Sequence, residues 1–296
     1  MRKFLLLLAI SIIPTLLIWF PFFTRLKSFW QIPLPSETGM AAIVANYDGP
    51  LYLVVAKTFY DKAAIKQSFQ FPLSTEYYAA HFPAFPFLTK IFSFGFGYPY
   101  ALLLVTLAAS VLAAYFFCKF ARLYLNEKEA LFLTLVFSIF PARWLIVKSV
   151  GSAEPLFVAA ILASLYFFQR KKYLAAGFWG VLAQFTKPPA ILLFAAYLMT
   201  TLTPLVKDAV LAHTKFKLGQ LRKIWPILLI PLTLIAVFLI YQIRLGDFWA
   251  YFHSGDNINL FFPPFQIFNY AAPWVGTACW RKSSLSTFSE FWDCCV

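Results

Sequence analysis

The chain has 296 residues, of which 61% are hydrophobic, 20% aromatic and only 12% charged, and its formal net charge is +13. Because an ordinary soluble domain is about 45 to 50% apolar and about 25% charged, this composition excludes a typical soluble enzyme and indicates an integral membrane protein. The Lys and Arg residues lie in short patches beside apolar runs, as is typical of membrane topology, so we expect membrane lipid as a partner and not nucleic acid.

The first apolar run extends from Phe4 to Phe23 and follows Arg2 and Lys3. It is longer than the core of a signal peptide and ends in aromatic residues, without a small-residue cleavage site, so it predicts a permanent first helix. With Arg2 and Lys3 kept in the cytoplasm, the N-terminus is cytoplasmic and the chain emerges on the other side.

No run from Thr24 to Tyr98 is apolar enough to cross a membrane. Apolar residues at near-helical spacing over Ile43–Phe59 predict a large external first loop whose amphipathic helices lie on the membrane surface. Two glycines and a proline in Gly95–Pro99 then predict a break in the chain before a second span, Tyr100–Phe120.

The later apolar runs predict the rest of a helical bundle, and Lys and Arg residues cluster after alternate spans as the positive-inside rule requires. The fold class is therefore all-α and polytopic, with about seven transmembrane helices. The further spans are expected at Ala130–Val147, Pro155–Phe168, two shorter helices of Tyr173–Val206 that are broken at Thr186–Pro189, and Ile224–Ile243.

This alternation of charge places every candidate polar group on the extracytoplasmic side. That side faces out from the plasma membrane in a prokaryote and into the endoplasmic reticulum in a eukaryote. The groups that we expect there are Asp48, His81, Arg143, Glu154, Lys187 and Arg244.

The composition changes abruptly after Ala278, and the segment Cys279–Val296 has neither a further span nor a helical period. One allowed set of codons for this segment, read in a shifted frame, encodes an ordinary eighth membrane helix. Residues 1–278 therefore predict one membrane domain that is incomplete at its C-terminus. Residues 279–296 are interpreted as a frameshifted tail or as a genuine short one, which resequencing the locus would decide.

The candidate residues each have an ordinary structural explanation beside the functional one. An ionisable residue near the membrane boundary, such as Asp48, needs a use or a partner, and a loop Lys could be that partner. Glu154 precedes Pro155, where an acid favours the first turn of a helix. His81 could carry a proton or bind phosphate, although a lone His is more often a surface hydrogen-bonding group.

Soluble-enzyme motifs are absent from the sequence: it has no Gly-rich phosphate loop, no Ser elbow, no paired metal-ligand motif and no Asp-x-Asp. A nucleotide donor is therefore not expected, because its pyrophosphate is normally held by a metal ion or by a nest of backbone amides.

The first loop resembles the signature of PIG-V-type mannosyltransferases, which are GPI mannosyltransferase-like enzymes of the GT-C fold superfamily. The matching residues are Tyr47-Asp48, the apolar stretch Leu51–Ala56, Glu76 and the run His81–Leu88. The family has Trp-Asp and Phe-Phe-Pro-x-x-Pro-Leu at these places, so Tyr47 replaces the Trp and His81 an aromatic residue.

Two later segments resemble further elements of this family. Ser152–Phe157 is similar to its Thr-Glu-Ser-Leu-Phe element, and Leu182–Pro188 is similar to its Leu-Ala-x-x-Thr-Arg-Pro element, with Lys187 in place of Arg. The similarity spans nearly all of Ile43–Ala196. Lysine lacks the bidentate fork of arginine, so a different grip on phosphate is implied.

The resemblance implies a glycosyltransferase that moves a hexose, mannose by the family name, from a polyprenyl phosphate to an acceptor hydroxyl with inversion. Asp48 would be the catalytic base, and the cations would stabilise the leaving phosphate without a metal or other cofactor. The implied binding residues are Tyr47, Glu76, His81 and Glu154 for acceptor or donor, and Lys187 and Arg143 for phosphate.

Two other interpretations stay open. A polytopic flippase or transporter of lipid-linked sugars would have external charges too, although transporters usually place charges near the middle of the membrane, where these spans are almost all apolar. An inactive, truncated homologue is the other alternative. Lipid, glycan and protein Ser/Thr acceptors all fit.

Overall fold

The computed structural model describes residues 2–69, 74–140, 142–211 and 222–254. Almost every element in this part is a helix, as predicted, and the exception is the short antiparallel pair β1 (Ser28–Phe29) and β2 (Ile32–Pro33). The helices are α1 (Arg2–Phe23), α2 (Met40–Val44), α3 (Gly49–Thr58), α4 (Lys62–Ser68), η1 (Thr75–Ala80), α5 (Ala84–Ala121), α6 (Glu127–Ile139), α7 (Ala142–Val147), α8 (Glu154–Gln169), α9 (Tyr173–Thr186), η2 (Pro188–Ala190), α10 (Ile191–Leu211), η3 (Trp225–Leu228) and α12 (Leu229–Leu245).

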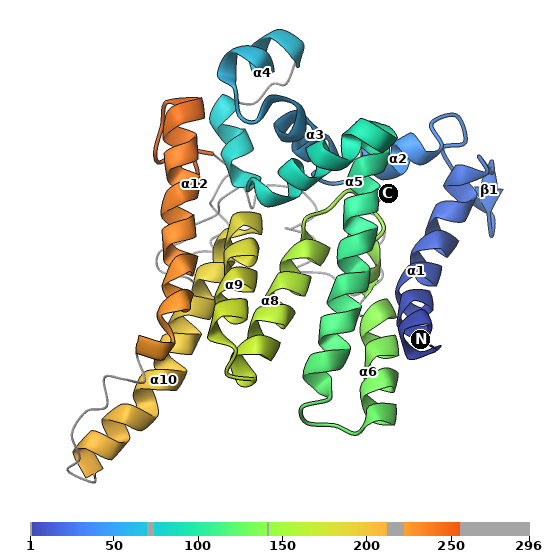
Figure 1. Ribbon diagram of the computed structural model, residues 1–296. Helices are drawn as coiled ribbons and strands as arrows, with labels where there is room; N and C mark the ends of the chain where they lie inside the picture. The colour runs from blue at the N-terminus through green and yellow to red at the C-terminus, as the bar shows by residue number, and fades with distance from the viewer. Residues whose placement is uncertain (1, 70–73, 141, 212–221, 255–296) are drawn as a thin grey trace, which may run out of the picture.

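The long helices form a bundle that is covered at one end. Figure 1 shows α5, α6, α8, α9 and α12 side by side, with α3 and α4 lying across one end of them. We call residues 40–69 and 74–80 the cap, and the end of the bundle under it the cap end. The opposite end, where α5 meets α6 and α8 meets α9, is the basic end.

Three helical segments in the described residues are long and apolar enough to cross a membrane, namely Leu5–Phe23, Ala84–Ala121 and Trp225–Leu245. They indicate a membrane protein. Glu154–Gln169 and Pro188–Pro204 are apolar but shorter. The number of seven spans and the orientation of the chain in the membrane stay predictions.

The predicted break at Gly95–Pro99 is confirmed. The chain is helical before and after Gly97, and both parts are counted as α5. Gly97 itself has φ 71° and ψ 157°, a non-helical conformation with positive φ that kinks the helix there. The apolar helix begins at Ala84, earlier than the expected span, because the aromatic run after His81 is itself helical.

The single span expected at Ala130–Val147 is wrong. Helix α6 ends at Ile139 and α7 begins at Ala142, so two short helices replace it. Phe140 precedes a proline in the sequence and is extended, with φ −132° and ψ 138°. A residue before proline avoids the helical region because the proline ring clashes with it. The apolar pattern of the sequence therefore did not suffice to make one continuous helix.

Helix α1 is attached to the segment after α7 by two hydrogen bonds, one partly buried and one buried. Trp19 Nε1 donates to the Ser149 carbonyl at 2.6 Å, and Lys148 Nζ donates to the Ser11 carbonyl at 3.0 Å. Lys148 is only 1% exposed, so its side chain lies between helices.

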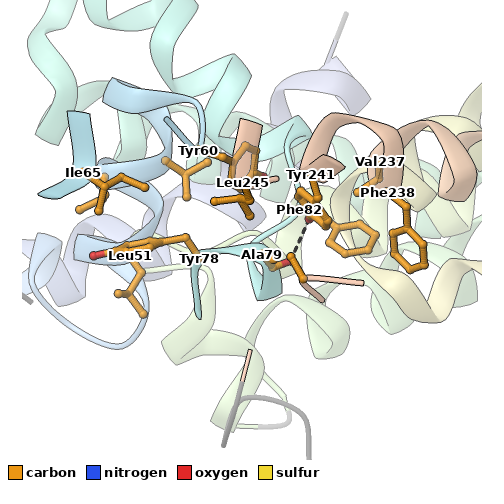
Figure 2. Close-up of a cluster of buried hydrophobic side chains, with 13 residues drawn as sticks. Leu51, Tyr60, Ile65, Tyr78, Ala79, Phe82, Val237, Phe238, Tyr241 and Leu245 are labelled. Carbon is orange, nitrogen blue, oxygen red and sulfur yellow. Dashed lines mark hydrogen bonds between the residues drawn. The ribbon is translucent and has the colours of Figure 1, made fainter. Parts of the chain in front are cut away.

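The cap is folded onto α12 through an aromatic core (Figure 2). The Tyr241 hydroxyl donates to the Ala79 carbonyl at 2.8 Å, and the rings of Tyr241 and Tyr60 lie 5.2 Å apart. Arg244 Nε donates to the Phe59 carbonyl at 2.9 Å, which satisfies an orphan acceptor at the end of α3. These contacts hold the cap rigidly over the helix ends.

The prediction of surface-lying amphipathic helices is wrong for α3. Seven of its ten residues are buried, because the cap packs against α5 on one side and α12 on the other. The helical period expected over Ile43–Phe59 is also interrupted between α2 and α3, where Tyr47 has φ 50°. This interruption brings Asp48 to the start of α3.

The segment Cys279–Val296 and the interpretation of it as a tail lie outside the described residues. So does the final part of the predicted membrane domain, from residue 255 onward.

Candidate functional site

Asp48 stands immediately before α3 and is not used to cap it, since its side chain makes no capping hydrogen bond. The side chain is 56% exposed and lies at a small cavity. Partial burial and the nearby Glu154 carboxylate raise the pKa of Asp48 above its ordinary value, while the Lys187 cation opposes them. A carboxylate with a raised pKa is a better proton acceptor than a free one.

His81 lies beneath Asp48 and is buried. Its Nε2 is 3.8 Å from Asp48 Oδ2, which is too long for a hydrogen bond. Burial and the Lys187 cation lower the pKa of His81 to about 4, so the imidazole is neutral at pH 7. The ring is held edge-on by Tyr52, with centroids 4.9 Å apart, and Tyr52 lies one helical turn after Asp48 on α3.

Glu154 and Lys187 form an ion pair across the ends of two helices. Glu154 begins α8 and Lys187 follows the last residue of α9, and Lys187 Nζ donates to Glu154 Oε1 at 2.7 Å. The Ser152 hydroxyl donates to the other carboxylate oxygen. Burial opposes ionisation of Glu154, but Lys187 and Ser152 outweigh it and hold the pKa of Glu154 below its ordinary value.

Two glycines let the Asp48 segment approach the Glu154 segment closely. A Cβ on Gly49 would lie 2.1 Å from the Val44 carbonyl oxygen, and a Cβ on Gly151 would lie 2.1 Å from a Leu102 methyl carbon and 3.6 Å from the Gly49 Cα. Real Cβ contacts are never so short. The backbone clash makes glycine necessary at position 49, whereas a Cβ at position 151 would require the Leu102 side chain to move. The two loops therefore meet backbone against backbone.

The Glu154 segment is also fixed to α5. Thr106 Oγ1 donates to the Ser152 carbonyl and accepts from the Ser152 amide, each at 3.2 Å. Thr106 is fully buried, so both hydrogen bonds are shielded from water. These hydrogen bonds hold the backbone just before Glu154 in place, and so fix the position of its carboxylate.

The cavity between these loops has a volume of about 60 Å³. A water molecule occupies about 30 Å³ of liquid, so the space admits a hydroxyl group or a few waters and no whole sugar ring. A larger substrate would lie over the exposed Asp48 carboxylate, outside the cavity. The lining residues are Tyr47, Asp48, Tyr52, Arg143, Val147, Val150, Gly151, Ser152 and Glu154.

Six of the seven predicted site residues come together here. Tyr47 and Arg143 lie at the rim with exposed side chains, around the Asp48, His81, Glu154 and Lys187 group. Glu76 does not join them. It pairs with Lys62 at 2.7 Å and lines a separate cavity of about 430 Å³ under α4.

Arg244 was predicted on the same side of the membrane as these residues, but its side chain binds the cap and not the site. Its guanidinium contacts Asp61 at 3.3 Å besides the end of α3. Tyr52 and Ser152 were missed as site residues. Ser152 stands two positions before Glu154 in the quoted motif, and Tyr52 shares the helical face of Asp48, so each had a signal in the sequence.

In the part of the chain that the structure describes, no three His, Cys, Asp or Glu side chains are grouped so that they could hold a metal ion. The expectation of metal-independent chemistry stays a prediction.

Comparisons with protein-family models, with curated proteins and with solved structures found no match to this chain.

Proposed function

We propose that the chain is an integral membrane glycosyltransferase of the GT-C type. It would move a hexose, mannose by resemblance, from a polyprenyl-phosphate donor to an acceptor hydroxyl, with inversion. One observation carries the proposal. The Asp48 carboxylate does not cap its helix, is about half exposed, and lies beside the Glu154–Lys187 ion pair at the end of a bundle that contains helices long and apolar enough to cross a membrane. A base next to a cation at a lipid boundary suits an acceptor hydroxyl and a lipid phosphate together.

Asp48 would take the proton of the acceptor hydroxyl as the hydroxyl oxygen attacks the anomeric carbon. Its raised pKa and its exposure at the rim support this role. The bond from the anomeric carbon to the phosphate oxygen breaks on the opposite face, and the electron pair leaves with the polyprenyl phosphate. Attack on one face with departure from the other inverts the anomeric centre.

The leaving phosphate needs charge stabilisation and no proton. Lys187 would supply it, with Arg143 at the rim as a second cation. Glu154 holds Lys187 by the 2.7 Å ion pair and so positions the cation. His81 is neutral and buried, which suits a positioning residue under Asp48 and not a phosphate ligand.

The proposed topology has about seven spans, a cytoplasmic N-terminus and the site on the extracytoplasmic side. It is supported by basic residues at the two connections of the basic end, which lies opposite the cap (Figure 1). Positive charge collects on the cytoplasmic side of membrane proteins. These residues are Lys119 at the end of α5, Arg122 just after it and Lys128 at the start of α6, and Arg170, Lys171 and Lys172 between α8 and α9.

The test is transfer by membranes that contain the full chain, incubated with a panel of radiolabelled polyprenyl-phosphate sugars. We expect label to move from one donor into a glycan, lipid or protein fraction. Asp48→Asn should lower this transfer by at least about 100-fold, because the carboxylate base is lost.

The matched control for this test is Glu37→Gln, an exposed acid in the same loop. It should change transfer by less than about twofold, as surface substitutions usually do. Undiminished transfer by a membrane-inserted Asp48→Asn protein would remove Asp48 from the role. No transfer from any donor would contradict the proposed function.

One observation favours a second candidate function, a flippase for lipid-linked sugars. The buried Lys148 cation binds the Ser11 carbonyl of α1, and charges between membrane helices are typical of transport pathways. In proteoliposomes, flipping of a fluorescent polyprenyl-phosphate sugar should then be lost in Lys148→Met and kept in Asp48→Asn. The transferase predicts no flipping in any of these proteins.

A further inference from the structure

A large cavity lies at the basic end, far from Asp48. Its volume is about 850 Å³, and it opens between the end of α8, the start of α9, α10 and η3. Helix α8 has 16 residues, with Glu154 first, so it separates the two sites by about 24 Å. The polar and charged residues that line it are Gln169, Lys171, Thr200, Thr201, Arg222 and Lys223.

The charge of this cavity has one sign. Lys171, Arg222 and Lys223 are all exposed, and no Asp or Glu is among the described residues that line it. Cations that converge on a cavity without a carboxylate favour an anion. The hydroxyl groups of Thr200 and Thr201 donate to the Ala196 and Tyr197 carbonyls of α10, so the basic side chains are the donors that the cavity offers to an anion.

An apolar stripe leads away from the mouth of the cavity. Trp225 lines the cavity, is 54% exposed and begins a candidate membrane span. Large apolar side chains on η3 and α12 follow it at helical spacing, each about half exposed, which makes a continuous face for hydrocarbon. They are Leu228, Leu232, Ile235 and Leu239.

The wall between the cavity and α9 is closely packed. A Cβ on Gly177 would lie 2.5 Å from the Pro226 carbonyl oxygen, so the start of η3 rests directly on the α9 backbone. This contact fixes Trp225 and Lys223 relative to Lys171. The cations therefore have a defined spacing instead of lying on a loose surface.

We propose that this cavity binds the headgroup of an anionic phospholipid, with the phosphate between Lys171, Arg222 and Lys223 and an acyl chain along the Leu228–Leu239 stripe. The cationic cavity is followed by the apolar stripe, as a charged headgroup is followed by an acyl chain in a lipid. A free anion would have no use for the stripe. Basic pockets between helices on the cytoplasmic side are suited to such lipids. The site is independent of the chemistry at Asp48.

The test uses the full chain, purified in detergent, and measures the midpoint temperature of unfolding during titration with dioleoylphosphatidylglycerol. We expect a saturable rise with this lipid, since a ligand that binds only the folded state stabilises it. Dioleoylphosphatidylcholine and inorganic phosphate at equal concentration should have no such effect, because one lacks net charge and the other lacks an acyl chain.

Removing all three cations in Lys171→Gln/Arg222→Gln/Lys223→Gln should raise the half-saturating lipid concentration on the order of 100-fold, at about five-fold per cation. Arg222→Gln alone should raise it about five-fold, which keeps the test usable where the triple variant does not fold. The matched control is Lys119→Gln/Arg122→Gln/Lys128→Gln at the same end, which removes equal charge outside the cavity and should leave the titration unchanged.

An equal rise with phosphatidylcholine or with phosphate, equal weakening in the control triple, or no saturable rise at all would overturn the proposal.

Discussion

The two ends of the bundle treat positive charge in opposite ways. At the cap end Lys187 is paired with Glu154 at 2.7 Å, Arg244 contacts Asp61, and the cavity beside Asp48 is only about 60 Å³. At the basic end three cations line a cavity of about 850 Å³ without a described acid. Paired charges in a small cavity shift the pKa of a neighbouring carboxylate, whereas cations without a described acidic partner in a large cavity attract an anion from solution.

The difference follows from the cap. Helix α3 and the aromatic core around Tyr241 cover the helix ends, and this cover removes water from His81 and partly from Asp48. Removal of water strengthens each charge interaction and shifts pKa values. The cations at the basic end are exposed to solvent and screened by salt, so they act on a ligand and not on one another.

The largest effect should come from breaking the ion pair at the cap end. Lys187→Gln should lower transfer on the order of 100- to 1,000-fold, because the leaving phosphate loses the donor that stabilises it. Lys187→Arg should retain part of the activity. The measurement is transfer of label from the polyprenyl-phosphate sugar that wild-type membranes use.

Lys62→Gln is the matched control for this comparison, since Lys62 and Glu76 also pair at 2.7 Å but line a different cavity. It should leave transfer within about twofold. Equal losses in the two variants would show that Lys187 acts through the fold alone.

A second, smaller effect should come from separating the two loops. Gly49→Ala places a Cβ against the Val44 carbonyl, so the backbone beside Asp48 must move. A misplacement of about 1 Å costs on the order of 100-fold in rate, and overpacking costs about 1–3 kcal/mol of the free energy of unfolding. Transfer and denaturant unfolding in detergent measure the two.

Gly95→Ala serves as the control for Gly49→Ala, because a Cβ at Gly95 has nothing within 4 Å. This substitution in α5 should stabilise the protein by about 0.5–1 kcal/mol. If Gly49→Ala matched it in transfer and stability, the close approach of the loops would not matter for the site.

The pH profile of transfer is a third, gentler probe. Partial burial and Glu154 raise the pKa of Asp48, so transfer should fall on acidification at a pH above the ordinary value for Asp. Glu154→Gln removes one of these causes and frees Lys187 to lower the pKa further, so the acid limb should move to lower pH. Glu37→Gln should leave the limb in place, and a move to higher pH in Glu154→Gln would contradict this electrostatic account.

The smallest effect is expected at Glu76. Its partner Lys62 is 39% exposed, and an ion pair of this kind contributes about 0–1 kcal/mol. Glu76→Gln should therefore change the free energy of unfolding by less than about 1 kcal/mol and transfer by less than about twofold. A loss as large as that of Asp48→Asn would return Glu76 to the site.

Much of the architecture is local and could be predicted. The break near Gly97 follows from two glycines and a proline in five residues, and the start of α8 follows from an acid before Pro155. The broken span at Phe140 shows the limit of an apolar pattern, because one proline outweighs it. Each of these features depends on residues a few positions apart.

The candidate site is only partly local. The sequence by itself determined that this is a helical membrane protein and which polar residues lie in its loops, because composition and periodicity are properties of the chain. The tertiary structure decided that Lys187 meets Glu154 from 33 positions away, that Glu76 turns to Lys62 instead, and that Gly49 rests against Gly151. Ion pairs and close backbone contacts depend on where helix ends meet in space, and that is set by the packing of the whole bundle.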